Sequence, residues 1–161
     1  MAELDAFSDL LDYPMYVVTA VAGGERAGCL VGFASQCSIQ PPRFTVWLSK
    51  ANRTYRVARR ATHLAVHLLH REQLDVARLF GGETGDEVDK FQRVAWRHGH
   101  GDAPVLTDAC AWFVGHVQDQ IEGGDHVGFL LDPVEASPKA PGRPPLVMFG
   151  DVADLSPGHP A

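Results

Sequence analysis

Apolar residues recur along this chain in short runs, and most of these runs have the length and composition of β-strands. Several alternate with polar residues or are rich in β-branched side chains, which is typical of buried or half-buried strands. Gly23-Gly24 lies between the first two runs and predicts a hairpin turn, whereas Pro133 predicts a sheet edge or a bulge. The predicted strands cover residues 15–22, 26–33, 35–39, 44–48, 63–69, 109–121, 126–136 and 146–149.

Apolar residues spaced three or four apart predict helices between the strands. Leu4, Phe7 and Leu11 have this spacing, and we expect their segment to pack on the body of the domain or on a partner subunit. Asn52 is a suitable N-cap for a second helix. The predicted helices cover residues 1–12, a segment that begins at Asn52, residues 72–80 and residues 86–94. Many short antiparallel strands with helices between them indicate a mainly β fold, a barrel with helices on its outside.

The bulk composition indicates one ordinary globular domain. The 161 residues are 45% hydrophobic and 21% charged, enough to bury a sizeable core. We expect a single domain over residues 1–161, with a core of about 14–150 and a tail at 151–161. The net charge of -6 argues against unspecific nucleic-acid binding. A local basic cluster is nevertheless present at Arg26, Lys50, Arg53, Arg56, Arg59 and Arg60.

Cysteine usage and hydropathy favour a reducing, aqueous compartment. Three cysteines, at 29, 37 and 110, are too few for a disulfide scaffold and lack metal-ligand spacing. No apolar run approaches the ~20 residues that a membrane helix requires, and the acidic N-terminus does not resemble a signal peptide. We therefore expect a cytoplasmic protein that does not bind membranes.

Residues 26–55 combine two chemical features that suit one ligand. Small and hydroxyl residues in the first half let a backbone approach a flat molecule closely, unless the segment is simply a small-residue strand packed on a neighbour. Lys50, Asn52, Arg53 and Thr54 follow, and they supply the donors and charge that a phosphate needs. A helix that begins near Asn52 would add unpaired N–H groups, although a solvated helix start has the same composition. An aromatic ring system joined to a phosphate is what a flavin nucleotide presents.

The same stretch resembles the flavin reductase-like family. The resemblance lies in Gly28, the serines and aliphatic residue of Ala34–Ile39, and Pro41-Pro42, which a strand and a polar turn follow. A second mark is Gly124-Asp125-His126, and the match covers roughly residues 14–149. The resemblance implies a six-stranded antiparallel split β-barrel of the FMN-binding type, with inserted helices.

The resemblance also implies roles for individual residues. Lys50, Asn52, Arg53 and Thr54 would bind the phosphate, and His126 would help to seat the nicotinamide. No residue is assigned as catalytic, because hydride passes directly between the two rings. The backbone past the isoalloxazine edge would be that of Leu30, Val31, Gly32, Ser35, Gln36, Cys37 and Ser38. Leu30 and Gly32 stand where threonine and serine or asparagine are frequent in the family, so fewer side-chain contacts to the flavin are expected.

The activity implied is NAD(P)H-dependent reduction of FMN or FAD by a homodimer with its flavin near the subunit boundary. Such a protein commonly supplies reduced flavin to the oxygenase of a two-component monooxygenase. Two alternatives remain, a flavin-binding or electron-transfer protein without reductase activity and a deazaflavin-dependent reductase. A metal site at His63, His67 and His70 is not expected, because alternating Leu64, Val66 and Leu68 predict a strand and no acidic or cysteine ligand has suitable spacing.

Overall fold

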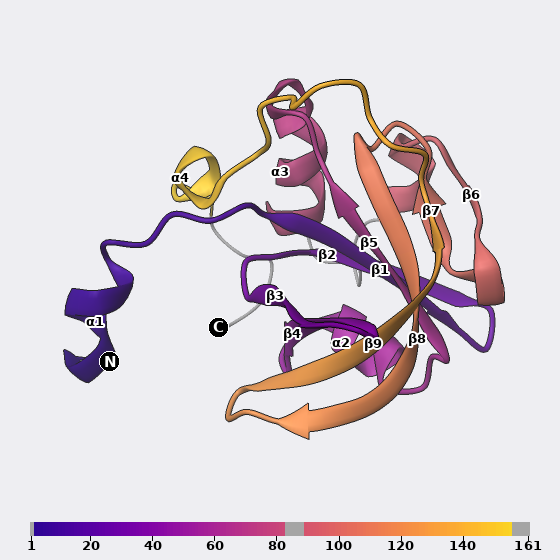
Figure 1. The fold of residues 1–161 in the computed structure, drawn as a ribbon, viewed down its shortest axis with the longest axis horizontal. Helices are drawn as coiled ribbons and strands as arrows, with labels where there is room; N and C mark the ends of the chain where they lie inside the picture. Colours follow the sequence, from indigo (N-terminus) through magenta and orange to yellow (C-terminus); the bar gives the residue numbers. More distant parts are fainter. Residues whose placement is uncertain (1, 83–88, 156–161) are drawn as a thin grey trace.

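A seven-stranded antiparallel sheet in the order β2-β1-β5-β8-β9-β4-β3 forms the body of the protein (Figure 1). The structure is a computed structural model that describes residues 2–82 and 89–155. The strands of this sheet are β1 (Tyr16–Ala22), β2 (Glu25–Val31), β3 (Ala34–Ile39), β4 (Pro42–Ser49), β5 (His63–Leu68), β8 (Ala111–Glu122) and β9 (His126–Ala136). A separate two-stranded sheet pairs β6 (Trp96–His98) with β7 (Pro104–Leu106).

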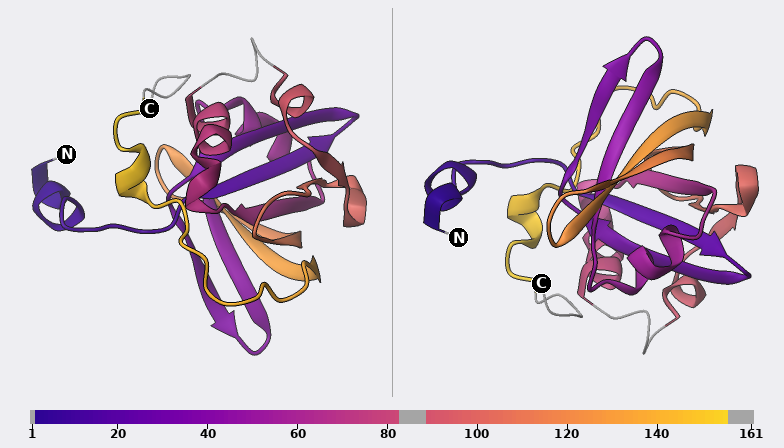
Figure 2. Two further views of the ribbon diagram at one scale, coloured as in Figure 1. Left: turned by 90° about the horizontal axis from the view of Figure 1, so that it is seen from above. Right: turned by 90° about the horizontal axis from the view of Figure 1, so that it is seen from below.

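Within the described residues, four α-helices and three 3-10 turns connect or flank these strands. The α-helices are α1 (Ala2–Ser8), α2 (Arg53–Ala58), α3 (Leu74–Gly82) and α4 (Phe149–Val152), and the 3-10 turns are η1 (Arg71–Gln73), η2 (Lys90–Arg93) and η3 (His100–Asp102). Helix α2 contacts β1, β2 and β4, and α3 contacts β2. Helix α1 stands apart from the sheet at the end of an extended lead (Figures 1 and 2). No helix in the described residues is long and apolar enough to cross a membrane.

The sheet curls so that its two edge strands are consecutive in the chain. Only Gly32 and Phe33 separate the end of β2 from the start of β3, although five strands lie between them in the sheet order. Strand β2 also contacts β4, the neighbour of β3. Figure 2 shows the β3–β4 hairpin projecting away from the β1–β2 hairpin. The chain therefore passes directly from one edge of the sheet to the other.

Two large apolar clusters fill most of the interior of the described residues, and a smaller third one consists of Ala65, Ala103, Val105 and Val114. One lies between the sheet and α2 and includes Val57, Leu64 and Phe129, each fully buried. The other packs under α3 and includes Phe80 and Phe91, whose rings meet edge to face with centroids 5.8 Å apart. Helix α2 packs on the sheet because its buried side, Val57 and Ala58, forms part of the first cluster.

Local sequence signals account for several element boundaries. Gly23 and Gly24 have φ values of 57° and 76°, the left-handed pair that a tight two-residue hairpin turn requires. The side chain of Asn52 accepts a hydrogen bond from the Thr54 N–H, so the predicted N-cap is confirmed. Strand β9 has the predicted bounds. Pro133 lies at a register shift between β8 and β9, as expected of a bulge.

Several sequence-based expectations differ from the structure. The main sheet has seven strands rather than six. Residues 146–149 form only isolated bridges at Leu146 and Met148 before α4 begins, because the preceding Pro144-Pro145 lacks the N–H groups that would extend a ladder. Of the helix predicted over 86–94, residues 86–88 lie outside the described chain and residues 90–93 form η2. Strands β6 and β7 were not predicted, since three residues carry too little periodicity.

A buried histidine ties β5 to both β1 and β7. The Nδ1 atom of His67 lies 2.8 Å from the Val17 carbonyl oxygen, and Nε2 accepts a hydrogen bond of 2.9 Å from the Leu106 N–H. Because one nitrogen faces an acceptor and the other a donor, the ring is held as the neutral Nδ1–H tautomer. Burial lowers the pKa of His67 from 6.5 to about 4, although the bond to Val17 opposes this shift.

We predict that His67 makes the protein less stable as the pH falls from about 6.5 to about 4. Its folded-state pKa is depressed, so the unfolded chain takes up the proton first and the free energy of unfolding declines by roughly 1.4 kcal/mol per pH unit. Above pH 6.5 the stabilisation is complete. Urea denaturation of the wild type and of His67→Gln from pH 7.5 to 4.5 measures the difference in slope.

The matched control for this prediction is His98→Gln, since His98 is exposed on β6. The control should keep the wild-type dependence of the free energy of unfolding on pH. His67→Gln should be less stable at pH 7.5, and its free energy of unfolding should fall less steeply with pH by the contribution of one proton. Equal slopes for the wild type and His67→Gln would contradict the assigned tautomer.

Candidate functional site

The residues predicted to face a flavin ring lie on the β2 end and along β3. Val31 is buried in the core, Leu30 is half-buried, and Gly32 lies in the connection to β3. Ser35, Gln36 and Cys37 are exposed. Because β3 is the last strand of the sheet and pairs only with β4, one side of its backbone is available to another molecule.

The polar side chains of β3 already have local partners. The Ser35 hydroxyl donates to the Gln36 carbonyl, the Gln36 amide donates to the Ser38 carbonyl at 3.1 Å, and the Ser38 hydroxyl donates to the Pro41 carbonyl at 2.6 Å. The ladder shifts register between Gln36 and Ser38, and the Cys37 sulfur lies 3.2 Å from the Thr45 hydroxyl. Because these side chains already have partners, the main-chain N–H and C=O groups are the principal hydrogen-bond donors and acceptors that this edge offers to another molecule.

The β2–β3 connection is held in place from two sides. A Cβ atom on Gly32 would lie 2.7 Å from Cε2 of Tyr13 and 3.3 Å from the Met15 sulfur, so glycine permits this close packing. The Phe33 carbonyl accepts a hydrogen bond of 2.9 Å from the Trp47 N–H. The connection therefore lies against the end of β4 instead of forming a loose loop.

His126 and Phe33 form an aromatic pair beside this connection. Their ring centroids are 5.2 Å apart, and the Phe33 side chain is 56% exposed. His126 opens β9 opposite Ser49 of β4, and its Nδ1 lies 2.7 Å from Asp125 Oδ1. The hydrogen bond and charge of His126 lower the pKa of the Asp125 carboxyl. Phe33 was not among the predicted site residues; a large aromatic between Gly32 and Ala34 was the available signal.

Lys50 joins the same end of the β3–β4 pair. Its backbone N–H donates to the Asp125 carbonyl at 2.9 Å, and its ammonium forms an exposed ion pair with Glu122. Lys50 and His126, which are 76 positions apart in the numbering, are thus brought together with Phe33. The structure places one cation, one imidazole and one exposed aromatic ring around the end of β4.

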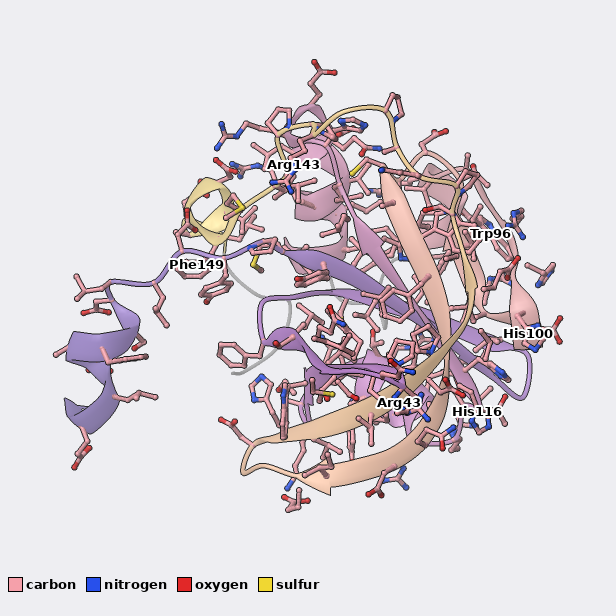
Figure 3. The ribbon with its side chains drawn as sticks, in the orientation of Figure 1. Arg43, Trp96, His100, His116, Arg143 and Phe149 are labelled. Atoms are coloured by element: carbon pink, nitrogen blue, oxygen red, sulfur yellow. The ribbon has the colours of Figure 1, made fainter. Side chains whose placement is uncertain are left out.

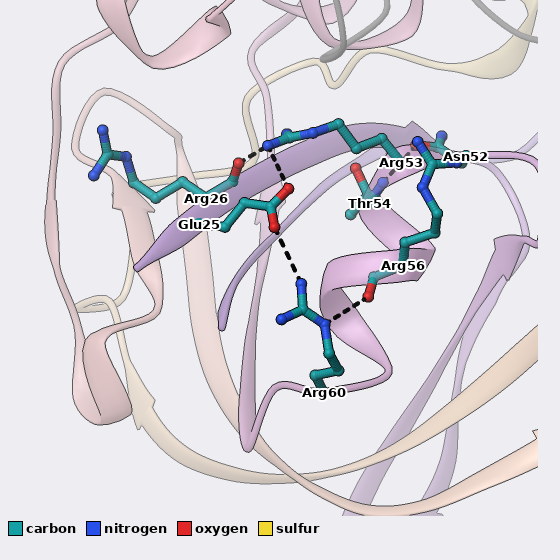
Figure 4. Close-up of polar contacts among 7 residues, drawn as sticks. All are labelled: Glu25, Arg26, Asn52, Arg53, Thr54, Arg56 and Arg60. Carbon is teal, nitrogen blue, oxygen red and sulfur yellow. Dashed lines mark hydrogen bonds and ion pairs between the residues drawn. The ribbon is translucent and has the colours of Figure 1, made fainter. Parts of the chain in front are cut away.

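The rest of the predicted phosphate turn lies at the start of α2 (Figure 4). Arg53 donates to the Arg26 carbonyl at 2.9 Å and to the Glu25 carboxylate at 2.8 Å, and Arg60 reaches the other Glu25 oxygen at 3.1 Å. Glu25 therefore lies between two guanidinium groups. Glu25 and Glu122 were not among the predicted site residues, because which carboxylates reach these cations depends on the pairing of β2 with β1 and of β8 with β9.

Thr54 differs from the other residues of this turn because its side chain is buried. It forms a side-chain hydrogen bond with Cys29, whose pKa burial raises to about 11. Its N–H donates to the Asn52 side chain. In this conformation neither group of Thr54 faces solvent, so Lys50, Arg53 and the half-exposed Asn52 carry the polar surface of the turn.

The histidines considered as metal ligands are not brought together. The ring of His67 is held by hydrogen bonds in the core, and the backbone N–H of His70 donates to the Gln73 side chain at the start of η1. The centroid of the His63 ring instead lies 5.1 Å from that of His100 and 5.1 Å from that of His116, the two residues labelled in Figure 3. Burial, His116 and His100 together lower the pKa of His63. Within residues 2–82 and 89–155, no group of three potential ligands has a metal-binding arrangement.

These features define a mainly β protein, built on a large curled antiparallel sheet, with an exposed main-chain edge beside a cationic turn. Residues 8–154 match the model of the flavin reductase like domain, and the chain belongs to that family. It is 36% identical over 114 residues to a protein of Rhizobium meliloti (strain 1021) named "Probable flavin reductase", with 68% of this chain covered. It is 30% identical over 146 residues to the NADH:riboflavin 5'-phosphate oxidoreductase of Streptomyces pristinaespiralis, with 90% of this chain and 81% of the relative covered.

Further similarities extend to a monooxygenase component and to a solved structure. The reductase component of a 4-nitrophenol 4-monooxygenase/4-nitrocatechol 2-monooxygenase from Rhodococcus opacus is 32% identical over 121 residues, which cover 74% of this chain. The NADH:FAD oxidoreductase of Streptomyces globisporus superposes with a TM-score of 0.76 at 26% identity, covering 86% of this chain and 81% of that one. The chain spans 36% of the length of the Rhizobium protein and 63% of the Rhodococcus protein.

We predict that Gly32→Ala destabilises the protein by about 1–3 kcal/mol, because the added methyl group would overlap the Tyr13 ring and displace the β2–β3 connection. The melting temperature measured by differential scanning fluorimetry should fall accordingly. Gly150→Ala is the matched control, since its Cβ would meet only Asp12 oxygens at 3.7 Å. A Gly32→Ala protein as stable as the control would show that the connection is less tightly packed than described.

Proposed function

We propose that the protein is an NAD(P)H-dependent flavin reductase that transfers hydride from a nicotinamide to FMN or FAD. The observation that carries the proposal is the convergence of an exposed edge strand, an aromatic–imidazole pair and a lysine at one end of the β3–β4 pair. The family match supports it, and so do relatives whose names specify NADH with riboflavin 5'-phosphate or FAD.

The donor set of the chain fits a flavin nucleotide. The backbone of β3 and of residues 30–32 can offer its main-chain groups to the rim of a flat ring. Small side chains let the ring come close, and the polar side chains of β3 already have local hydrogen-bond partners. Ala34 pairs with Val46 and Phe33 with the Trp47 N–H, so the start of β3 lies near the β4 end that leads into Lys50. A ring along β3 would therefore direct its phosphate toward Lys50, Asn52 and Arg53.

Each group of residues would have a positioning role. A bound flavin supplies the hydride acceptor at N5. The main-chain donors of β3 would stabilise negative charge that develops on the ring rim, and Lys50 and Arg53 would hold the phosphate after partly exchanging their carboxylate partners. His126, oriented by Asp125, would hold the nicotinamide over the ring. Leu30, Val31, Gly32, Ser35, Gln36, Cys37 and Ser38 would line the flavin.

The proposal includes an assembly and a location. We propose a homodimer with flavin near the subunit boundary and a cytoplasmic location, which the free Cys29, Cys37 and Cys110 support. An oxygenase partner is proposed because one relative is a monooxygenase reductase component.

We also assign the curled sheet to the FMN-binding split-barrel class, with six strands as the barrel and β3 as an added edge strand. The two-residue connection between the edge strands supports this assignment.

Removing the cations of the turn should weaken phosphate binding selectively. We predict that Lys50→Ala/Arg53→Ala raises the dissociation constant for FMN at least about tenfold, because charge-assisted hydrogen bonds are lost, while riboflavin, which lacks the phosphate, binds as to the wild type. Flavin fluorescence titration measures both constants. Arg59→Ala, which removes an exposed arginine at the C-terminal cap of the same helix, is the control and should leave both unchanged. An equal loss for FMN and riboflavin would contradict the phosphate assignment.

The reductase activity is tested by NADH and NADPH oxidation with and without added FMN or FAD. We predict turnover only with flavin present, and a KM for the nicotinamide raised about tenfold in His126→Ala with the FMN dissociation constant unchanged, because a positioning contact is lost. Gln118→Ala, on exposed β8 surface, is the control. Flavin binding without nicotinamide oxidation would favour a carrier or sensor instead.

A further inference from the structure

The face of β4 that is turned away from the core carries a tryptophan beside the candidate site. Val46 is fully buried in the first apolar cluster, so its neighbour Trp47 points to the other face of the strand. In the ladder with β9, Trp47 lies opposite Gly128. Two residues farther on, Ser49 lies opposite His126. Opposed residues of an antiparallel pair share one face of the sheet, so Trp47 and His126 are on the same face.

The indole of Trp47 lies flat on two glycines. Its ring atoms Cη2, Cζ3 and Cε3 would be 2.8, 2.8 and 3.0 Å from a Cβ atom on Gly128, and Cζ3 would be 2.5 Å from a Cβ atom on Gly123. Nearly equal distances to three atoms of one ring mean that the ring faces this backbone. Because neither glycine has a side chain, one face of the indole rests on the main chain and the opposite face is turned away from the sheet.

The three tryptophans differ in what stacks on their rings. The guanidinium groups of Arg26 and Arg97 lie over the rings of Trp96 and Trp112, 4.6 and 5.1 Å from the ring centroids. Within residues 2–82 and 89–155, no aromatic ring or cation has such a contact with Trp47. Trp47 is half-buried, and its outward face is therefore available to a flat ligand.

The surroundings of this indole suit a flat ring that is joined to a phosphate. The Trp47 N–H donates to the Phe33 carbonyl, so the start of β3 lies directly beside it. Lys50 follows three residues later, a distance of roughly 10 Å along an extended chain, which the ribityl chain of a flavin nucleotide can span. A ring on Trp47 can thus direct its rim to the main chain of β3 and its phosphate to Lys50.

The electronic character of the ligand favours a flavin over the other ring system that the proposed reaction brings to the site. Indole is the most electron-rich aromatic side chain, and it attracts electron-poor partners most strongly. The isoalloxazine ring is electron-poor and extends over three fused rings. The adenine of a nicotinamide dinucleotide is smaller and electron-rich, so it is the weaker partner.

We propose that Trp47 is the stacking platform for the isoalloxazine ring. The inference rests on the proposed function and deepens it, because no residue of β4 was among the predicted flavin-lining residues. Trp47 would cover one face of the ring and leave the other face for the nicotinamide. Gly123 and Gly128 would act through Trp47, since their lack of a side chain keeps the indole flat.

The experiment compares the dissociation constants of riboflavin, FMN and AMP by isothermal titration calorimetry. Trp47→Leu should raise the constants of riboflavin and FMN by the same factor, at least about fivefold, because a stacking contact is lost. Loss of the cations at Lys50 and Arg53 should instead affect FMN alone. Trp112→Leu, the same change at a tryptophan that Arg97 already covers, is the control and should leave both flavin constants unchanged.

A second variant separates stacking from mere packing. Trp47→Phe keeps an aromatic face, so it should bind riboflavin more tightly than Trp47→Leu. Indole donates an electron to an excited flavin on which it stacks and thereby quenches the flavin emission, whereas a phenyl ring does not. With protein in excess of riboflavin, the bound riboflavin should therefore be dim in the wild type and brighter in Trp47→Phe. The melting temperatures of all variants show whether each is folded.

Riboflavin affinity that is unchanged in Trp47→Leu would overturn the proposal, and so would equal emission from riboflavin bound to the wild type and to Trp47→Phe. Weaker binding of AMP, but not of riboflavin, by Trp47→Leu would also overturn it by assigning the indole to adenine. NADH oxidation measured on the same samples tests the proposed function separately. Flavin binding that depends on Trp47 without NADH oxidation would overturn only the proposed function, and flavin-dependent NADH oxidation with riboflavin affinity independent of Trp47 would overturn only the stacking platform.

Discussion

The passage of the chain from β2 to β3 is the constraint on which the rest of this structure depends. Two residues, Gly32 and Phe33, carry the backbone between the two edge strands of the sheet. The absence of a side chain at Gly32 lets Tyr13 and Met15 pack against the connection, and the Trp47 N–H holds the Phe33 carbonyl. Because this short segment closes the curl of the sheet, β3 keeps one open side next to the end of β4. An inserted residue here would loosen both the curl and that open edge.

The cationic turn is an electrostatically balanced surface rather than a set of free charges. Lys50 is paired with Glu122, and Arg53 with Glu25, which Arg60 also contacts. Exposed pairs of this kind contribute little to stability, so under the proposed function a doubly charged phosphate, which offers more acceptor oxygens, would displace their carboxylates. The pairs also keep long side chains oriented in the absence of ligand. The expected consequence is selectivity for a phosphate over a single carboxylate.

The features of the fold that could be predicted from the sequence depend on residues close together in the chain. Several features that were not predicted depend on contacts between distant residues or on very short elements. The Gly23-Gly24 turn, the Asn52 cap and the bounds of β9 each depend on residues close in sequence. All seven strands of the main sheet coincide with predicted strands, and only the count of six implied by the family resemblance differs. The bridges at Leu146 and Met148 depend on His70 and Pro14, far along the chain, whereas β6 and β7, of three residues each, are too short for a periodic pattern. A preceding Pro-Pro pair was the local clue against a strand at 146–149.

The same distinction applies to the candidate site. Lys50, Arg53 and His126 were singled out from residue type, spacing and family resemblance, and their assigned roles remain predictions. Their partners Glu122, Glu25 and Phe33 were not singled out, because each contact joins separate elements. The burial of Thr54 could not be predicted from the sequence either, because its contact with Cys29 follows from the packing of α2 on β2.

The protonation states of the polar groups favour chemistry based on positioning. Neutral His67 is committed to the contacts among β1, β5 and β7, and a pKa of about 4 keeps it uncharged at neutral pH. Cys29, with a pKa of about 11, stays a thiol and is a poor nucleophile. The Asp125 carboxyl, whose pKa is lowered by His126, is a weak base. Transfer of a hydride between two stacked rings requires none of these groups to exchange a proton, only a surface that aligns the rings. An edge strand with its main chain exposed, flanked by Phe33 and His126, is suited to that task because its donors are fixed before any ligand arrives.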